Sequence, residues 1–365
     1  MVNYIEEIKE LEKELATTPY NKRTQHHVGL IKAKIARLRE SQIKRSSSKK
    51  KGEGFSVRKT GDGTVILVGY PSVGKSTLLN ALTNARSKIA AYAFTTLTVI
   101  PGLMVYEHAK IQILDVPGIV KGAALGIGRG KEVLAVMRNA NLVVFIIDIN
   151  SPGHLRILQK EVHDTGLRVN KRKPFVKIRK TARGGIRIGA TVKLTRITKQ
   201  TITAILHEFK INNADVLIRD DIDAEDLIDC IEDNKVYIPG MVVLNKIDMA
   251  TPAQVKKVMK ETGADLAISA SMKTNTEKMK ARIFRGLNFI RIYLKEPNKP
   301  ADTEVPLIMF KGSTLHTLCE KLHRDFVTRF RFARIWGPSA KFDGQKMVNL
   351  RHAIKDKDII ELHIA

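Results

Sequence analysis

The sequence is poor in cysteine and has no long apolar run. Of its 365 residues only two, Cys230 and Cys319, are cysteine, which is too few for a disulfide framework or a cysteine-rich zinc site. The longest apolar run, Leu142 to Ile147, is stopped by Asp148, far short of the roughly 18 residues that a membrane-spanning helix needs. The first residues, MVNYIEEIKE, contain no apolar signal core. We therefore expect a cytoplasmic protein with no membrane partner.

Acidic residues are also scarce, and their shortage leaves a large positive charge. Lys and Arg total 63 against 37 Asp and Glu, a formal net charge of +26. Such an excess repels itself unless an anionic partner neutralises it, and nucleic acid is the leading candidate. A basic surface that is only solvated is the alternative. The length predicts two or three domains, and 43% hydrophobic residues predict a globular chain.

A phosphate-binding loop is predicted in VILVGYPSVGKST, residues 65–77. An apolar strand-like run comes before the loop, and the helix-like LLNAL follows it. The spacing fits G-x-x-x-x-G-K-[ST], in which backbone N–H groups wrap a phosphate, the lysine reaches the outer phosphates and the hydroxyl binds Mg²⁺. A turn without a ligand is the alternative. The candidate nucleotide contacts are Gly69, Tyr70, Pro71, Ser72, Val73, Gly74, Lys75, Ser76 and Thr77.

Two further motifs are typical of a nucleotide switch. Asp115-Val-Pro-Gly118 follows the strand-like IQIL, so Asp115 is expected to hold Mg²⁺ through water and Gly118 to lie beside the γ-phosphate. Phe94-Thr95-Thr96-Leu97 supplies a threonine that can close over Mg²⁺ and the γ-phosphate. We therefore predict Lys75, Gly118 and a threonine, Thr95 or Thr96, as the residues that assist catalysis, with Phe94 and both threonines as nucleotide contacts; the family resemblance described below favours Thr96.

The base is predicted to be guanine. Asn245-Lys246-Ile-Asp248 follows the strand-like MVVL, and a carboxylate there can accept from guanine N1–H and the exocyclic amine, which adenine does not offer. Ser269-Ala270-Ser271 follows a further strand-like segment and would support the edge of the base. The motifs predict a GTPase that binds GTP and GDP. An ATP-preferring enzyme and an RNA-binding module in which the nucleotide is structural are the alternatives.

The fold class is predicted to be α/β, with a P-loop GTPase domain. Strand-like segments at 64–69, 103–107, 111–115, 142–148 and 241–245 alternate with helical stretches, which predicts a mostly parallel sheet covered on both faces. Residues 3–40 have the apolar spacing of a helical hairpin. Residues 42–54 are basic and Ser-rich without periodicity, which is typical of a linker.

An inserted α+β domain explains the gap of about one hundred residues between the strands ending at 148 and 245. Residues 165–207 contain twelve Lys or Arg and no acid. FVKIRK and IRIGATVKL there predict a basic β-hairpin or small sheet, followed by the helix TITAILHEFKI. Residues 220–233 predict an amphipathic helix with a solvated acidic face. We take Lys171, Arg172 and Lys173 as candidate RNA contacts.

The C-terminal residues 305–365 predict a helix packed on a small mixed sheet. Basic residues there lie near Phe330, Phe332 and Trp336, a pattern that fits either RNA binding or core aromatics with solvated neighbours. The predicted domains are 1–60 (helical hairpin and basic linker), 61–168 and 236–296 (GTPase), 169–235 (insert) and 297–365 (C-terminal).

The motifs also carry a family resemblance. GYPSVGKSTLLNAL, AYAFTTLTVIPG, LDVPGIVKGAALGIGRG and LNKID resemble the Obg-type branch of the translation-factor GTPases. The whole chain resembles the developmentally regulated GTP-binding proteins, most closely an archaeal type. The resemblance implies an insert similar to a domain of a small-subunit ribosomal protein and a TGS-like tail with a β-grasp fold. It also implies Ser76 and Thr96 as Mg²⁺ ligands, a ribosomal role in translation, and a protein partner on the tail.

One position departs from Ras-like GTPases. Ile119 follows Gly118 where those enzymes place the glutamine that orients the attacking water. The Obg-type branch shares this substitution, so slow intrinsic hydrolysis is expected, with the water positioned by other groups or by a partner. Ser72 stands where some potassium-activated relatives carry asparagine, which makes K⁺ a candidate second cation.

Overall fold

The computed structural model describes residues 4–19, 21, 23–47, 61–83, 100–115 and 137–364. These residues form two compact units. The first, here called the hairpin–insert unit, contains the described residues up to 47 together with 163–237. The second, here called the nucleotide unit, contains those from 61 to 162 together with 238–364. In the described part of the chain, no helix is both long and apolar enough to cross a membrane.

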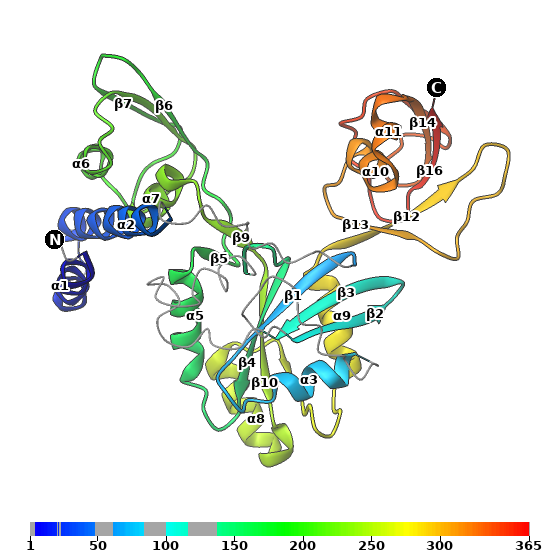
Figure 1. Ribbon diagram of the computed structural model, residues 1–365, viewed down its shortest axis with the longest axis horizontal. Helices are drawn as coiled ribbons and strands as arrows, with labels where there is room; N and C mark the ends of the chain where they lie inside the picture. Colours follow the sequence, from blue (N-terminus) through cyan, green and yellow to red (C-terminus); the bar gives the residue numbers. More distant parts are fainter. Residues whose placement is uncertain are drawn as a thin grey trace. The chain divides into compact units, whose positions relative to one another are not determined.

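A six-stranded sheet forms the centre of the nucleotide unit (Figure 1). Its order is β11-β10-β4-β1-β3-β2, and all neighbours are parallel except the antiparallel pair β2–β3. The predicted mostly parallel α/β sheet is therefore confirmed. The strands are β1 (Gly63–Val68), β2 (Ile100–Tyr106), β3 (Ala109–Asp115), β4 (Leu142–Asp148), β10 (Gly240–Asn245) and β11 (Leu266–Ala267).

Helices cover both faces of this sheet. Every residue of β1 is buried, which is expected of a parallel strand with helices on both sides. Val65 and Leu67 share one apolar cluster with residues of α3 and α9, so the alternate residues of β1 point to the opposite face, on the side where Figure 1 shows α5. The helices described around this sheet are α3 (Lys75–Leu82), α5 (His154–Asp164), α8 (Pro252–Thr262) and α9 (Thr276–Gly286).

The predicted N-terminal hairpin consists of α1 (Tyr4–Thr17) and α2 (Gln25–Ser47). Ile8, Ile31, Ile35 and Leu38 form the buried cluster between the two helices. The prediction of a linker from residue 42 was wrong at its start, because α2 continues to Ser47. Gln, Lys and Arg are good helix formers, and the segment contains no Pro or Gly to end the helix.

The insert contains a three-stranded sheet with the order β6-β8-β7. Its strands are β6 (Val176–Lys180), β7 (Ile186–Ala190) and β8 (Ala214–Ile218). The small sheet is as predicted, but the hairpin is not, because β8 separates β6 from β7. The alternating ADVLI places three apolar residues on the core side of β8, so the central position of the sheet suits this strand better than the basic β6 and β7. The short β5 (Leu167–Val169) pairs with β9 (Val236–Ile238).

The second helix of the hairpin packs on the insert. Figure 1 shows α2 beside α6 (Lys199–Glu208) and α7 (Ala224–Glu232). A Cβ on Gly29 would lie 3.0 Å from Thr201 Cγ2 and 3.4 Å from Ala224 Cβ, so the glycine allows a close approach of the helices. Arg37 and Glu208 form an ion pair at 3.0 Å across this contact. Ala33 of α2 belongs to the apolar core of the insert, so the hairpin packs on the insert through its second helix.

The acidic helix α7 is not solvated along its whole polar side. Asp229 is 4% exposed and accepts from Arg168 Nε at 2.5 Å and Nη2 at 2.7 Å. The expectation of a solvated acidic face was wrong at this position, since Arg168 comes from β5, far away in the sequence. Asp233 and Asp220, which flank α7, form ion pairs closer to the surface, with Lys173 and Arg172.

A five-stranded sheet with the order β13-β12-β16-β14-β15 forms the C-terminal part of the nucleotide unit. Its strands are β12 (Phe289–Lys295), β13 (Leu307–Phe310), β14 (Phe330–Trp336), β15 (Gln345–Met347) and β16 (Ile359–Ile364). The sheet thus takes in residues before the predicted boundary at 297. The predicted single helix is two, α10 (Leu315–Leu322) and α11 (Arg324–Thr328), because His323 is extended.

The aromatic residues of this sheet are divided between its two faces. Phe330 packs against the core. Phe332 stacks on His363 with ring centroids 4.2 Å apart, and Lys295 Nζ lies 4.7 Å from the centroid of the Trp336 ring. Phe332 and Trp336 are therefore covered by neighbouring side chains.

Candidate nucleotide-binding site

The site lies where parallel strands end. Parallel pairing brings the carboxyl ends of β1, β3, β4 and β10 to one edge of the sheet, where ligands of α/β proteins bind. Leu67 pairs in register with Asp115, and Asp148 with Asn245. The residues that follow β1, from Gly69 to Gly74, form the loop that leads into α3.

Both motif glycines are required by the geometry of this loop. A Cβ on Gly69 would lie 2.7 Å from the carbonyl oxygen of Ile146. Gly74 has φ +91° in the left-handed region, and a Cβ there would lie 2.4 Å from Asn245 Nδ2. Ser72 also has a positive φ, of 62°. The backbone therefore turns sharply at the positions where a phosphate loop needs it.

Lys75 lies at the first position of α3 and points back over the loop. Its Nζ donates to the carbonyl oxygens of Gly69, at 3.0 Å, and Tyr70, at 2.9 Å. Burial lowers the pKa of Lys75, and the nearby Asp115 carboxylate partly opposes this shift. A desolvated ammonium in this place gains by contact with a phosphate, whose negative charge favours the protonated form.

Ser76 and Asp115 are joined directly. Ser76 Oγ donates to Asp115 Oδ2 at 2.8 Å. Asp115 is 4% exposed, and its Oδ1 is buried without a hydrogen-bond partner among the described residues. A buried carboxylate oxygen of this kind costs free energy unless a cation or a donor meets it. The pair therefore fits Mg²⁺, which binds one or two protein oxygens together with waters and phosphates.

Asn245 connects the base motif to the phosphate loop. Its Nδ2 donates to the Val73 carbonyl at 2.8 Å, and its Oδ1 accepts from Ala270 N at 3.0 Å. The residue is 2% exposed. Segments far apart in the sequence are thus joined by one buried amide.

The remaining predicted base contacts follow β10 and β11. Asp248 is exposed and lies on η2 (Ile247–Met249), directly after β10. The backbone N–H of Ile247 donates to the carbonyl of Ile268 at 3.2 Å. Ser269 is buried, and its hydroxyl lies 3.0 Å from that of the exposed Ser271. The two base motifs are therefore neighbours, with Asp248 free to meet a ligand edge.

Two side chains near the loop, those of Asp148 and His154, were not predicted from the sequence. Asp148 Oδ2 lies 2.7 Å from the Nζ of Lys246. Burial acts to raise the pKa of Asp148, but the hydrogen bonds from Lys246 and the Asn150 backbone outweigh it and lower the pKa. The position of Asp148 at the end of a buried strand is the signal that could have indicated it. His154 stacks on Tyr70 of the loop at 4.2 Å between ring centroids, and nothing in its sequence context points there.

Several predicted site residues lie outside the described part of the chain. They are Phe94, Thr95 and Thr96 of the first switch, and Gly118 and Ile119 after Asp115. Among the described residues, no group of three or more His, Cys, Asp or Glu is placed to hold a metal ion.

Comparison with known proteins agrees with this geometry. The family described as 50S ribosome-binding GTPase matches residues 64–180, its C-terminal region matches residues 183–289, and the TGS domain matches residues 290–364. An uncharacterised GTP-binding protein of Methanocaldococcus jannaschii is 49% identical over 98% of this chain and 92% of its own length. Developmentally-regulated GTP-binding protein 2 of Mus musculus is 41% identical over 98% of both chains. The chain belongs to the family of developmentally regulated GTP-binding proteins.

The match to these developmentally regulated GTP-binding proteins covers 98% of the chain. The protein is a GTP-binding P-loop GTPase with a TGS domain, as the motifs predicted. Solved structures that it resembles include the YchF GTPase of Schizosaccharomyces pombe, with a TM-score of 0.43, 13% identity, and coverage of 84% of this chain and 99% of that one. Aquifex aeolicus Era bound to GDP and aluminium fluoride gives a TM-score of 0.34 and 20% identity, with coverage of 76% and 72%.

Proposed function

We propose that this GTPase is a Mg²⁺-dependent switch that signals its nucleotide state to RNA, most directly to the ribosome, in the cytoplasm. One observation carries the nucleotide part of the proposal. Lys75 and Ser76 of the phosphate loop, Asp115 and Asn245 come from three separate motifs and meet at one edge of the sheet. Such a meeting is needed to hold phosphates, a metal and a base at the same time.

The roles of the residues follow from their chemistry. We propose that the Lys75 ammonium exchanges the carbonyls of Gly69 and Tyr70 for the outer phosphates. Ser76, Thr96 and, through water, Asp115 would hold Mg²⁺, which neutralises charge on the β- and γ-phosphates when bound. Asp248 would select guanine, and Ser269, Ala270 and Ser271 would support the base. Thr96 and Gly118 would assist at the γ-phosphate.

Hydrolysis is proposed to be slow without a partner. Isoleucine at position 119 cannot hydrogen-bond the attacking water. Positioning of that water is left to backbone groups, to the first switch, to K⁺ or to the partner. The gain from such assistance can be large, because supplying one missing group to a GTPase changes the rate by roughly 10³–10⁵.

The RNA part of the proposal is supported by charge. A net charge of +26 favours a polyanionic partner. The matching family description names the large ribosomal subunit as what such GTPases bind. The protein partner expected on the TGS domain stays a prediction.

Single-turnover hydrolysis with and without purified ribosomes tests the proposal. We expect slow, Mg²⁺-dependent turnover alone and faster turnover with ribosomes, measured in K⁺ and in Na⁺ to test the second cation. An absence of turnover under every condition would favour a module in which the nucleotide is structural. Calorimetry with GTP and ATP addresses the other alternative, since tighter binding of ATP would exclude a guanine-specific site.

A further inference from the structure

The sheet of the insert has one covered and one open face. Strand residues alternate between faces, and the inward ones belong to the apolar core beneath α6 and α7. These are Val176, Ile178, Ile186, Ile188, Ala214, Val216 and Ile218. The outward residues of β6 and β7 are exposed. Among the described residues of the hairpin–insert unit, the helices pack only on the inward face (Figure 1).

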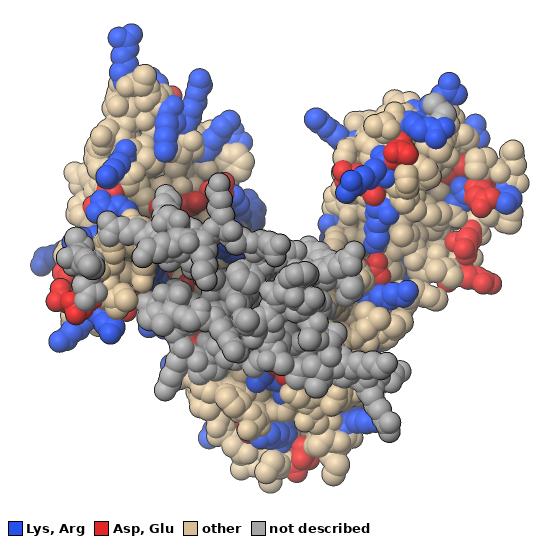
Figure 2. All heavy atoms as spheres, viewed as in Figure 1, with Lys and Arg blue, Asp and Glu red and all other residues tan. Residues whose placement is uncertain are grey.

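The open face carries cations in two rows. Strand register places Arg179, Asp215 and Arg187 side by side in one row, and Lys177, Leu217 and Gly189 in the next. Neighbouring strands are about 4.8 Å apart and successive outward residues about 7 Å apart. Figure 2 shows Lys and Arg side chains projecting from the end of the unit that carries β6 and β7.

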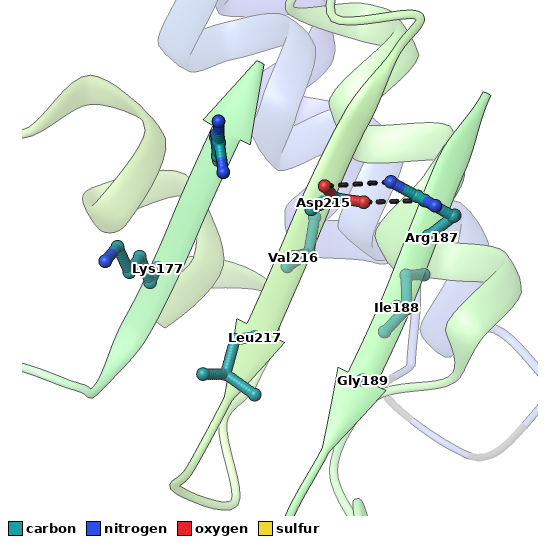
Figure 3. Close-up of a pocket in the computed structure, with 8 residues that line it drawn as sticks. Lys177, Arg187, Ile188, Gly189, Asp215, Val216 and Leu217 are labelled. Atoms are coloured by element: carbon teal, nitrogen blue, oxygen red, sulfur yellow. Dashed lines mark hydrogen bonds and ion pairs between the residues drawn. The ribbon is translucent and has the colours of Figure 1, made fainter. Parts of the chain in front are cut away.

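Only part of the positive charge of the insert is neutralised by carboxylates of the same unit. Asp215 binds Arg187 at 2.7 and 3.0 Å, as the dashed lines in Figure 3 mark. Asp233 pairs with Lys173 at 2.6 Å, and Asp220 lies 3.6 Å from Arg172. The carboxylates that flank α7 therefore serve the predicted RNA contacts at 172 and 173.

A different set of cations has no acidic partner. Lys177, Arg179, Lys180 and Arg183 are exposed, and no carboxylate among the described residues lies within ion-pair distance of them. All four belong to β6 or to the turn after it. β6 and the turn after it therefore carry four exposed cations that no carboxylate among the described residues pairs with.

The shape and chemistry of the face favour a phosphate backbone over bases. A shallow depression of about 400 Å³ lies on it, lined by Lys177, Arg179, Arg187, Gly189, Asp215 and Leu217, with Ile188 and Val216 (Figure 3). Gly189 contributes no side chain, and a Cβ there would meet nothing closer than 4.0 Å. Among the residues that the structure describes, no aromatic ring lines the depression, whereas single-stranded bases are usually held by aromatic stacking.

We propose that the open face of β6-β8-β7 binds the backbone of a double-helical RNA, with Lys177 and Arg179 as phosphate contacts. The proposal rests on the RNA partner in the proposed function and assigns that partner a surface. Asp215 limits the charge of the face by holding Arg187. Its removal therefore strengthens RNA binding, while loss of Lys177 and Arg179 weakens it.

Fluorescence anisotropy of the full chain with a labelled RNA duplex of about 20 base pairs tests this surface. We expect Lys177→Ala/Arg179→Ala to weaken binding about tenfold and to lower the salt slope by about 1 per cation. Asp215→Asn should tighten binding several-fold. Lys256→Ala/Lys257→Ala, on exposed positions of α8, removes the same charge elsewhere and should leave the slope nearly unchanged.

Each other outcome has a defined meaning. If the wild-type chain binds the duplex and both double variants bind it equally well, the β6-β8-β7 face is not the RNA-binding surface, although RNA remains a partner of the protein. If the wild-type chain binds neither the duplex nor ribosomes at low salt, both the proposed surface and the proposed RNA partner are contradicted. If Lys177→Ala/Arg179→Ala loses affinity for poly-glutamate but not for the duplex, the face binds acidic protein and the proposal is overturned.

Discussion

Asn245 and Val73 are joined by a buried hydrogen bond from Nδ2 to the carbonyl oxygen, 2.8 Å long. The bond links the end of β10, where the base is expected, to the middle of the phosphate loop. Because the same amide also accepts from Ala270 N, one side chain sets the spacing of three site segments. The absence of a Cβ on Gly74 is what leaves room for it.

Asn245→Ala should therefore weaken binding of both GTP and GDP. Loss of two buried hydrogen bonds, with their partners left unsatisfied, is expected to cost about 2–3 kcal/mol. Calorimetry measures the change, with Asn80→Ala on the exposed side of α3 as the control. Asn245→Asp keeps the acceptor for Ala270 N but not the donor to Val73, so an affinity equal to wild type in that variant would contradict the bridging role.

Lys75→Ala should lose affinity for phosphates and not for the base. A charge-assisted contact of this kind is worth about 3 kcal/mol. GTP and GDP binding would fall, whereas competition by guanosine, which has no phosphate, would be unchanged. Equal GTP affinity in the variant and the wild type would remove Lys75 from the site.

Asp248→Asn should change base preference while sparing the phosphates. The new amide can donate to the carbonyl at position 2 of xanthine but meets the amine of guanine. We expect the preference for GTP over XTP to fall by at least about tenfold, which corresponds to about 1.4 kcal/mol in binding free energy. Competition binding with GTP, XTP and ATP measures it, and an unchanged order of affinities would show that Asp248 does not contact the base.

Arg168→Ala should destabilise the hairpin–insert unit strongly. Removal of one partner of a buried ion pair leaves the Asp229 charge uncompensated, at an expected cost of about 3–5 kcal/mol. Chemical denaturation followed by circular dichroism measures the cost. Lys173→Ala breaks the exposed pair with Asp233, in which the side chains are 58% and 72% exposed, and should cost less than about 1 kcal/mol. Similar losses in the two variants would contradict the buried role of Arg168.

Low pH should destabilise the hairpin–insert unit, because Glu225 becomes protonated. The hydrogen bond from His163, with further help from His163 and Lys32 charges, lowers the pKa of Glu225 to about 2 although burial opposes the shift. A lowered carboxyl pKa stabilises the fold above its unfolded value of 4.5, and this contribution is lost as the pH falls towards 2. The contribution is up to about 3 kcal/mol. Glu225→Gln should reduce the change in the free energy of unfolding between these pH values. An unchanged dependence on pH would show that Glu225 is not the group responsible.

The sequence predicted the loop, the sheet and the order of the motifs because these depend on local patterns. A G-x-x-x-x-G-K-S loop after an apolar strand and a carboxylate at a strand end can each be read from a few adjacent residues. Parallel pairing then requires them to meet at one edge. Nothing in that inference depends on side-chain contacts.

What the sequence did not indicate depends on contacts between distant segments. Arg168 and Asp229 are each ordinary charged residues until the fold buries them together. Likewise β8 lies between β6 and β7 because its inward residues complete the core, although adjacent basic strands suggested a hairpin. The packing of α2 on the insert through Gly29 is of the same kind.

Sedimentation of the protein with purified ribosomes, in GDP and in a non-hydrolysable GTP analogue, tests the central claim most directly. A switch that signals to the ribosome must bind it differently in its two states, because a ligand shifts an equilibrium only through differential affinity. We predict more protein in the ribosomal pellet with the GTP analogue than with GDP, and no difference for Lys75→Ala. Equal amounts of wild-type protein in both nucleotide states, or none in either, would contradict the account.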